Sequence, residues 1–281
     1  MPDLYIIAFK GFRRGYYYNT YHHALASDEW VITEAERGED MGRVSKPVPD
    51  EIKLEFEERP PSILRPSTPQ DKELAQSNIG AEIEAMKKCE QLVAKHGLPM
   101  KLIDSEYQHD RNKLTFYFVS EQRVDFRALV RDLAAIYRTR IELRQIGVRD
   151  AARRLDGFGI CGLRQCCVSF LKGFEPISTQ FAREQNLSLN PAKISGNCGR
   201  LLCCLMYERE HYSEALARFP HQGEAYTTEK GAGVIEMINI FDSYMIVAHP
   251  NGETEKVTLT DIRKQERQTK SFFKNWHTTT E

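Results

Sequence analysis

The chain has 281 residues and 41% of them are hydrophobic, which is enough for ordered cores and excludes a largely disordered chain. The formal net charge of −1 excludes a preference for nucleic acid or membrane carried by the chain as a whole, so any such preference must be local. Leu4–Phe9, the longest apolar stretch near the N-terminus, is too short for a signal peptide or a membrane span. We therefore expect a cytoplasmic protein that does not insert into a membrane.

Residues 1–58 are predicted to form short β-strands. The runs Leu4–Lys10, Gly15–Tyr18 and Trp30–Thr33 are rich in the β-branched and aromatic side chains that favour strands. Residues 59–71 contain four prolines, which fix the backbone and withhold hydrogen-bond donors. This segment is therefore predicted to be a linker that ends the first β region.

Residues 72–148 are predicted to form an αββαβ module. Apolar residues recur at helical spacing between Asp71 and Lys95 and again in Phe126–Tyr137. Because helices on one face of a small sheet would bury both apolar surfaces, we expect a ferredoxin-like, split βαβ arrangement. The expected strands are Lys101–Tyr107, Leu114–Val119 and Arg140–Ile146.

Residues 149–219 form a segment in which glycines interrupt any regular pattern around six cysteines. We expect it to be an irregular, cluster-binding insertion with short helices near 178–186 and 205–217. Residues 220–265 return to β character, with expected strands at Gly233–Ile240, Tyr244–Ala248 and Glu255–Leu259. We predict that these strands pack with the N-terminal ones in one small β-barrel-like part, and that residues 266–281 are a tail. The predicted fold class is therefore α+β.

The motif Cys-Gly-x-x-x-Cys-Cys occurs twice, which indicates a metal site. Structural zinc sites take their ligands from Cys-x2-Cys pairs, whereas a four-residue gap between ligands occurs in plant-type ferredoxins. In a reducing compartment, structural disulfides are disfavoured as well. The spacing therefore favours an iron–sulfur cluster over zinc. The candidate ligands are Cys161, Cys166, Cys167, Cys198, Cys203 and Cys204.

Adjacent cysteines tend to direct their side chains to opposite sides of the chain. One member of each pair, together with Cys161 and Cys198, would thus supply four thiolates for one cluster. The two remaining thiols either serve a second cluster completed by partner chains or pack as inert core. The seventh cysteine, Cys89, falls on the expected first helix of the module and is predicted to be a small hydrophobic residue without a function.

Residues 123–154 contain nine arginines and no lysine, against four acidic residues. Guanidinium groups bind phosphate and carboxylate in a bidentate manner, so this region is a candidate surface for RNA or for an acidic partner. The alternative is that several of these arginines simply form the solvated face of a helix. The candidates for phosphate or acidic-partner contact are Arg127, Arg131, Arg144, Arg149 and Arg153.

The sequence contains no glycine-rich dinucleotide loop, P-loop, Gly-x-Ser-x-Gly elbow or His-Glu-x-x-His motif. We therefore expect a protein that is not an enzyme. Two other functions remain as alternatives: a nucleic-acid-binding module with a structural metal and, less favoured, an electron-transfer protein.

Motifs of one known family occur in seven segments: Arg111–Phe118, Arg123–Phe126, Thr139–Asp150, Gly159–Gly162, Gln185–Pro191, Lys193–Gly196 and Cys198–Leu205. Together these segments resemble the RicT (YaaT) family of the PSP superfamily, which shares a conserved C-terminal domain. The resemblance implies a regulator without catalytic activity that carries one or two [4Fe-4S] clusters, the second shared with partners. It also implies a complex with RicA-like and RicF-like proteins that modulates RNase Y-dependent mRNA processing, with recruitment to the membrane through RNase Y. In spore formers this would control sporulation, competence and biofilm formation.

Overall fold

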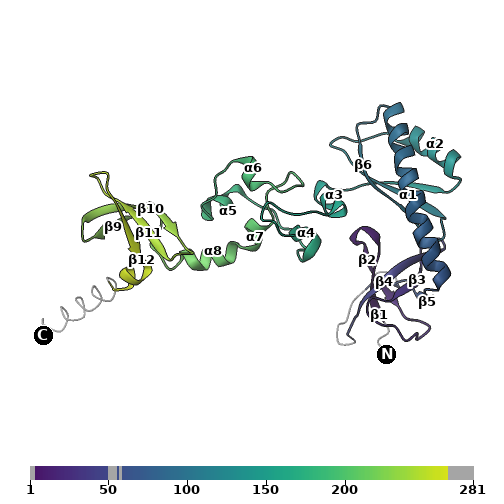
Figure 1. The fold of residues 1–281 in the computed structure, drawn as a ribbon, viewed down its shortest axis with the longest axis horizontal. Helices are drawn as coiled ribbons and strands as arrows, with labels where there is room; N and C mark the ends of the chain where they lie inside the picture. The colour runs from purple at the N-terminus through teal and green to yellow at the C-terminus, as the bar shows by residue number, and fades with distance from the viewer. Residues whose placement is uncertain (1–3, 50–55, 57–58, 265–281) are drawn as a thin grey trace. The chain divides into compact units, whose positions relative to one another are not determined.

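The computed structural model describes residues 4–49, 56 and 59–264 and shows a mixed α+β protein (Figure 1). The chain divides into two compact units. Unit 1 comprises Met1–Leu171 and Asn197–Gly199, and unit 2 comprises Lys172–Gly196 and Arg200–Glu281. Among the described helices, none combines the length and the apolar character needed to cross a membrane.

The N-terminal part of unit 1 is a five-stranded antiparallel sheet in the order β2-β1-β4-β3-β5. A bridge between Tyr18 and Ser62 also joins the end of β2 to the segment before β5, so the sheet curls. Two of the strands were not predicted. β4 was missed because it contains a glycine and mostly polar side chains. β5 was missed because it lies inside the expected linker at residues 59–71, where the prolines argued against a strand. It forms at the edge of the sheet, where a strand tolerates proline. The strands are β1 (Leu4–Ala8), β2 (Arg14–Tyr18), β3 (Trp30–Glu34), β4 (Glu39–Pro47) and β5 (Ile63–Pro66).

One face of this sheet forms its core, which includes Ile7, Val31 and Val44 at 0–1% exposure. Gly42 of β4 lies on the same face, paired with Val31. A Cβ atom at Gly42 would lie 2.3 Å from Cγ2 of Ile7 and 2.9 Å from the Phe9 ring. The glycine is therefore required by the close approach of β4 to its neighbour rather than by its backbone conformation.

Gly42→Ala should lower the free energy of unfolding by about 1–3 kcal/mol, because the methyl group overpacks a filled core. Chemical denaturation of the full chain measures the change. Gly80→Ala on a helix is the matched control, since nothing lies within 4 Å of its added methyl group, and it should stabilise slightly. Equal stabilities for the two variants would contradict the packing argument.

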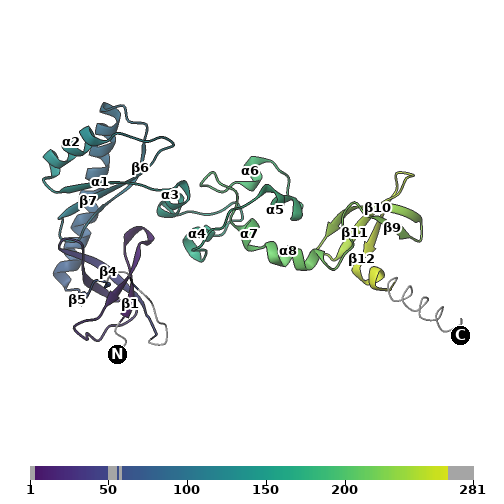
Figure 2. The ribbon, with the colours of Figure 1, turned by 180° about the vertical axis from the view of Figure 1, so that it is seen from behind.

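The second part of unit 1 has the predicted αββαβ element order. The sheet order is β6-β7-β8, and Phe116 and Phe118 of β7 pack under helices α1 and α2 together with Leu129 and Leu133 (Figures 1 and 2). Cys89 of α1 is fully buried in this core, as expected. The elements are α1 (Pro69–Lys95), β6 (Lys101–Tyr107), β7 (Lys113–Val119), α2 (Arg127–Tyr137) and β8 (Arg140–Gln145).

The ferredoxin-like expectation for this module is wrong. A split βαβ unit requires another strand between the two parallel strands, whereas β7 and β8 pair directly, from Lys113 with Arg140 to Phe118 with Gln145. Periodicity locates the strands but does not encode their order, which is why the sequence did not reveal the difference.

The cysteine-rich segment contains only short helices, two of them close to the predicted positions 178–186 and 205–217. In unit 1, α3 and α4 lead into and out of the first cysteine motif. In unit 2, Ala182, Ile194 and Leu205 form a small core shared by the other helices. The helices are α3 (Val148–Leu155), α4 (Cys166–Ser169), α5 (Thr179–Glu184), α6 (Pro191–Ile194), α7 (Cys204–Tyr207) and α8 (Arg209–Leu216).

Unit 2 ends in a four-stranded antiparallel sheet in the order β12-β11-β10-β9. The prediction that these strands join the N-terminal ones in one barrel-like part is wrong. Each set forms a sheet of its own with its own core, which here includes Ile235, Met245 and Val247. The expected tail at residues 266–281 lies outside the described residues. The strands are β9 (Ala225–Thr228), β10 (Gly231–Asn239), β11 (Tyr244–Ala248) and β12 (Thr254–Thr258).

Candidate functional site

The first cysteine motif folds as a small hairpin. Phe158 and Arg164 pair in an antiparallel bridge, and the Gly159 N–H donates to the Leu163 carbonyl at 2.8 Å. Cys161 is thereby placed in the turn, where its side chain is exposed.

The second motif folds in the same way. Ser195 and Leu201 pair in an antiparallel bridge, and the Gly196 N–H donates to the Arg200 carbonyl at 2.8 Å. Cys198 lies in the turn and is half-buried. Every bonded position of this hairpin has its counterpart 37 residues earlier, so the sequence repeat is also a structural repeat.

The glycine after each turn cysteine has a backbone requirement. Gly162 has φ 78° and Gly199 has φ 73°, in the left-handed region that side chains with a Cβ rarely adopt. This explains why Cys-Gly recurs in both copies, each time in a tight turn.

The paired cysteines lie at the base of each hairpin, where a short helix begins. Cys166 is the first residue of α4 and is half-buried, whereas Cys167 is buried. Cys203 precedes α7 and Cys204 begins it, and both are half-buried. In the first pair the two side chains thus differ in their access to solvent, whereas in the second pair they do not.

Four of the six cysteines belong to unit 1: Cys161, Cys166, Cys167 and Cys198. Within that unit, the Asn197 side-chain amide donates to the Phe158 carbonyl at 2.9 Å and holds the turn of the second hairpin against the first. In the described part of the chain, no three or more His, Cys, Asp or Glu side chains are arranged as a metal-binding group. By its chemistry the donor set fits an iron–sulfur cluster, because it consists of thiols alone.

An ion pair braces the first hairpin. The Arg164 guanidinium binds the Asp156 carboxylate through two nitrogens, with Nη2 to Oδ2 at 2.5 Å. This pairing lowers the pKa of Asp156 below its ordinary value. Arg164 therefore holds together the two ends of the hairpin.

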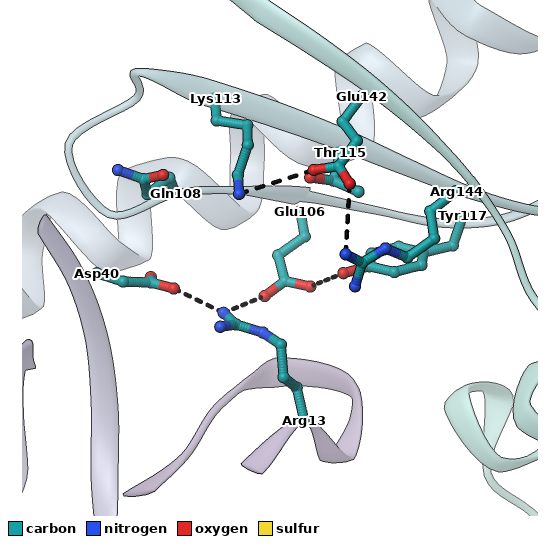
Figure 3. A pocket seen from close by; sticks show the side chains of 9 residues that line it. All are labelled: Arg13, Asp40, Glu106, Gln108, Lys113, Thr115, Tyr117, Glu142 and Arg144. Atoms are coloured by element: carbon teal, nitrogen blue, oxygen red, sulfur yellow. Dashed lines mark hydrogen bonds and ion pairs between the residues drawn. The ribbon is translucent and has the colours of Figure 1, made fainter. Parts of the chain in front are cut away.

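A hollow of about 90 Å³ in unit 1 is lined mainly by charged side chains (Figure 3). The Arg13 guanidinium donates to Asp40 at 2.6 Å and to Glu106 at 3.2 Å, and the Tyr117 hydroxyl donates to Glu106 at 2.9 Å. Burial, with the neighbouring Glu106 charge, raises the pKa of Tyr117 to about 12. These groups join the N-terminal sheet to the polar face of the β6–β8 sheet.

A buried arginine from α3 completes this network. Arg154 pairs with Asp104 at 2.7 Å and with Glu106 at 3.4 Å, and its guanidinium carbon lies 3.4 Å from the centroid of the Tyr117 ring. A Cβ on Gly11, in the turn after β1, would collide with the same guanidinium. The helix that leads into the first cysteine hairpin is therefore fixed to both sheets of unit 1.

The chain is similar to a known protein over most of its length. One family model, the PSP1 C-terminal conserved region, matches residues 61–146, and another, PSP1-like protein, third domain, matches residues 176–219. The "Stage 0 sporulation protein YaaT" of Bacillus subtilis is 44% identical over 250 residues, which cover 88% of this chain and 90% of that protein. The chain belongs to the YaaT family.

Two yeast proteins are similar over shorter regions. An uncharacterized protein of Schizosaccharomyces pombe is 31% identical over 168 residues, covering 50% of this chain and 22% of that protein. Protein PSP1 of Saccharomyces cerevisiae is 50% identical over 50 residues, covering 18% of this chain and 6% of that protein. No solved structure matches the chain.

The five arginines proposed as phosphate contacts do not form one surface in this YaaT family member. Arg127 and Arg131 lie on α2, which packs on the apolar face of the β6–β8 sheet. Arg144 of β8 pairs with Glu142 on the opposite, polar face. On α3, Arg149 is half-buried, and the guanidinium carbon of Arg153 lies 4.9 Å from the centroid of the Phe12 ring.

The charged hollow was missed by sequence reasoning. The alternation of polar residues along β6 and β7 was a signal for a polar sheet face. The residues that cover this face, Arg13 and Asp40, come from the N-terminal sheet, and a single sequence does not show which distant strands meet. Because the charges in this hollow pair with one another, we assign it a role in holding unit 1 together.

Proposed function

We propose that the chain is a non-catalytic regulatory scaffold that binds a [4Fe-4S] cluster through the cysteines of its two hairpins. The observation that carries the proposal is the repeated hairpin, which presents a turn cysteine and a basal pair twice in the same geometry. The regulatory role rests on the family, since the B. subtilis relative is named a stage 0 sporulation protein.

The number of thiols supports the use of both hairpins. Each hairpin contains three cysteines, and a four-thiolate cluster needs at least one more. In this proposal Cys161 with one member of Cys166/Cys167, and Cys198 with one member of Cys203/Cys204, would supply the four ligands. The other two thiols would serve a second cluster that partner proteins complete, or would pack as inert core.

Cys89 is excluded as a ligand by its surroundings. The thiolate is the metal-binding form, and burial raises the pKa of Cys89 to about 12. Its side chain is fully buried between α1 and the β6–β8 sheet. It therefore provides a cysteine substitution that leaves the cluster intact.

We further propose that this scaffold assembles with RicA-like and RicF-like proteins in the cytoplasm and modulates mRNA processing by RNase Y, through which it is recruited to the membrane. Control of sporulation, competence and biofilm formation in spore formers would follow from that activity. Identity of 44% over most of both chains with a protein named for stage 0 of sporulation supports the sporulation part of this proposal.

Anaerobic purification tests the cluster. The wild-type protein should be coloured and contain about four iron and four sulfide per cluster. Cys198→Ser should lose most of the iron and the visible absorbance, because serine does not replace a thiolate ligand. Thermal unfolding of the αββαβ module should remain unchanged, since that module has its own core.

Cys89→Ala is the matched control and should retain the iron content of the wild type. A colourless protein with stoichiometric zinc would favour the alternative, a structural metal in a nucleic-acid-binding module. Iron content that rises when RicA-like and RicF-like proteins are added would support a second cluster. Equal iron in Cys198→Ser and wild type would contradict the ligand assignment.

A further inference from the structure

The face of the N-terminal sheet opposite its core carries aromatic and cationic side chains around Tyr16 and Trp30, whereas Ile32 on the same face is fully buried. Strand register places Tyr16 opposite Ile6, Arg43 opposite both Ala8 and Trp30, and Lys46 opposite Ile6. Residues that pair across antiparallel strands share a face, and the alternate residues of these strands form the core. The side chains of interest on the outer face are Arg14, Tyr16, Tyr18, Trp30, Arg43 and Lys46.

These aromatic rings are accessible although they lie on a sheet. Tyr16 is 38% exposed and Trp30 is 42% exposed. Tyr16 also contacts the Phe56 ring at 5.4 Å between centroids, which leaves part of the tyrosine accessible. Exposed large aromatic residues gathered on one face mark interaction sites more often than isolated ones do.

Cations flank the rings closely. The guanidinium carbon of Arg43 lies 5.8 Å from the centroid of the Trp30 ring, and that of Arg59 lies 5.7 Å from the Tyr18 ring. Arg14 and Lys46 are exposed on the same face. Asp28, at 3.4 Å from Arg43, is an acidic neighbour, and it is itself 77% exposed, so the pair is open to exchange with another anion.

Rings for stacking beside cations for phosphate are the chemistry that single-stranded nucleic acid requires. Two residues along a strand span about 7 Å, so Tyr16 and Tyr18 can each stack a different base. An acidic peptide would satisfy the cations but would leave the rings without stacking partners. This sheet face also lacks the helix or ribbon that enters the major groove of a duplex.

We infer that the outer face of the N-terminal sheet binds single-stranded nucleic acid. The site lies on strands β1 to β4 and uses none of the six candidate cluster ligands, so it is independent of the proposed cluster. Strand register also places Glu34 and Glu39 on this face, but at the opposite end of β3 from Trp30, so the cations gather around the aromatic rings. Base stacking on rings, rather than base-edge hydrogen bonds, implies weak sequence preference.

Fluorescence anisotropy of the full chain with a labelled oligouridylate of about 12 nucleotides tests the inference, since such sites span roughly 4–16 nucleotides. Trp30→Ala should weaken binding about 5- to 100-fold and Trp30→Phe should restore most of it. Arg43→Ala should reduce the salt dependence of the affinity, because about one phosphate contact is lost. An oligothymidylate of equal length shows whether RNA is preferred over DNA.

Phe241→Ala in unit 2 is the matched control, because Phe241 is 74% exposed in the turn between β10 and β11 and its loss should leave the affinity unchanged. Cys198→Ser should also bind the oligonucleotides normally, which separates this test from that of the cluster. Absence of binding at low salt, or equal affinities for Trp30→Ala and wild type, would overturn the inference. If the protein bound polyglutamate and neither oligonucleotide, the inference would also be overturned, and the face would be a protein-docking surface.

Discussion

Replacing Arg154 with alanine is expected to destabilise unit 1 by about 3–5 kcal/mol, the cost of removing one partner from a buried ion pair. The side chain is 7% exposed and pairs with two carboxylates, those of Asp104 and Glu106. It also stacks on the Tyr117 ring, so the substitution removes packing as well as charge. Because Lys10 and Arg13 still neutralise the two carboxylates, we expect the lower part of this range.

Urea unfolding of the full chain, followed by the fluorescence of Trp30 in a Trp276→Phe background, measures the loss. Arg127→Ala is the matched control, since Arg127 also pairs with a carboxylate but is 85% exposed. Exposed ion pairs contribute little, so this variant should unfold close to wild type. Equal unfolding midpoints for Arg154→Ala and wild type would show that α3 is held by other contacts.

Replacing Asp71 with alanine should cost about 2–4 kcal/mol, because the carboxylate both caps α1 and makes charged hydrogen bonds. It accepts from the Arg65 guanidinium at 2.5 and 3.0 Å and from the Thr68 backbone N–H at 2.7 Å, and its side chain is 11% exposed. The Thr68 hydroxyl in turn accepts from the Asp71 backbone N–H. This reciprocal pair is a capping box, which fixes the first turn of the helix.

The same carboxylate makes stability depend on pH. The Arg65 guanidinium, together with bonds from Thr68 and His109, holds the pKa of Asp71 well below its usual range. The folded state therefore favours the ionised form, and its contribution is fully present above the unfolded pKa of about 4 and is lost as pH falls towards the folded pKa. Asp71→Ala should unfold with a weaker acid dependence than wild type.

Asp125→Ala provides the control for the pH experiment. The pKa of Asp125 is also lowered, to about 2, by hydrogen bonds from the Arg127 side chain, but this pair is on the surface. Its removal should leave stability at neutral pH nearly unchanged. If Asp125→Ala lowered the free energy of unfolding as much as Asp71→Ala, pairing with a neighbouring arginine, and not burial beside the helix cap, would control the stability.

The elements that sequence predicted well are those defined by local pattern. The apolar spacing of α1 and α2 and the apolar runs of β6 and β7 are preserved in the structure because each buries one side in the same core. The cysteine motif was visible as a repeat, although the hairpin that each copy forms around a glycine with positive φ was not predicted. In both cases the signal lies within a short stretch of chain.

What the sequence did not predict depends on long-range pairing. β4 contains Gly42 and several charged residues, a local pattern that is typical of a turn. Its role as a strand depends on the packing of Ile7 against that glycine, which the local sequence does not show. Arg154 was one of nine arginines in its region, and its burial depends on Asp104, 50 positions away. The order of strands in the αββαβ module and the separation of the two terminal sheets likewise arise from tertiary contacts.

The bridge between Tyr18 and Ser62 affects how this protein behaves at high concentration. Unpaired strand edges act as templates on which further chains add, which leads to aggregation. In the N-terminal sheet the Tyr18 N–H donates to the Pro61 carbonyl at 2.9 Å, and the prolines at 60 and 61 offer no N–H to an incoming strand. The curl thus blocks one end of the β2 edge against self-association while leaving the outer face open.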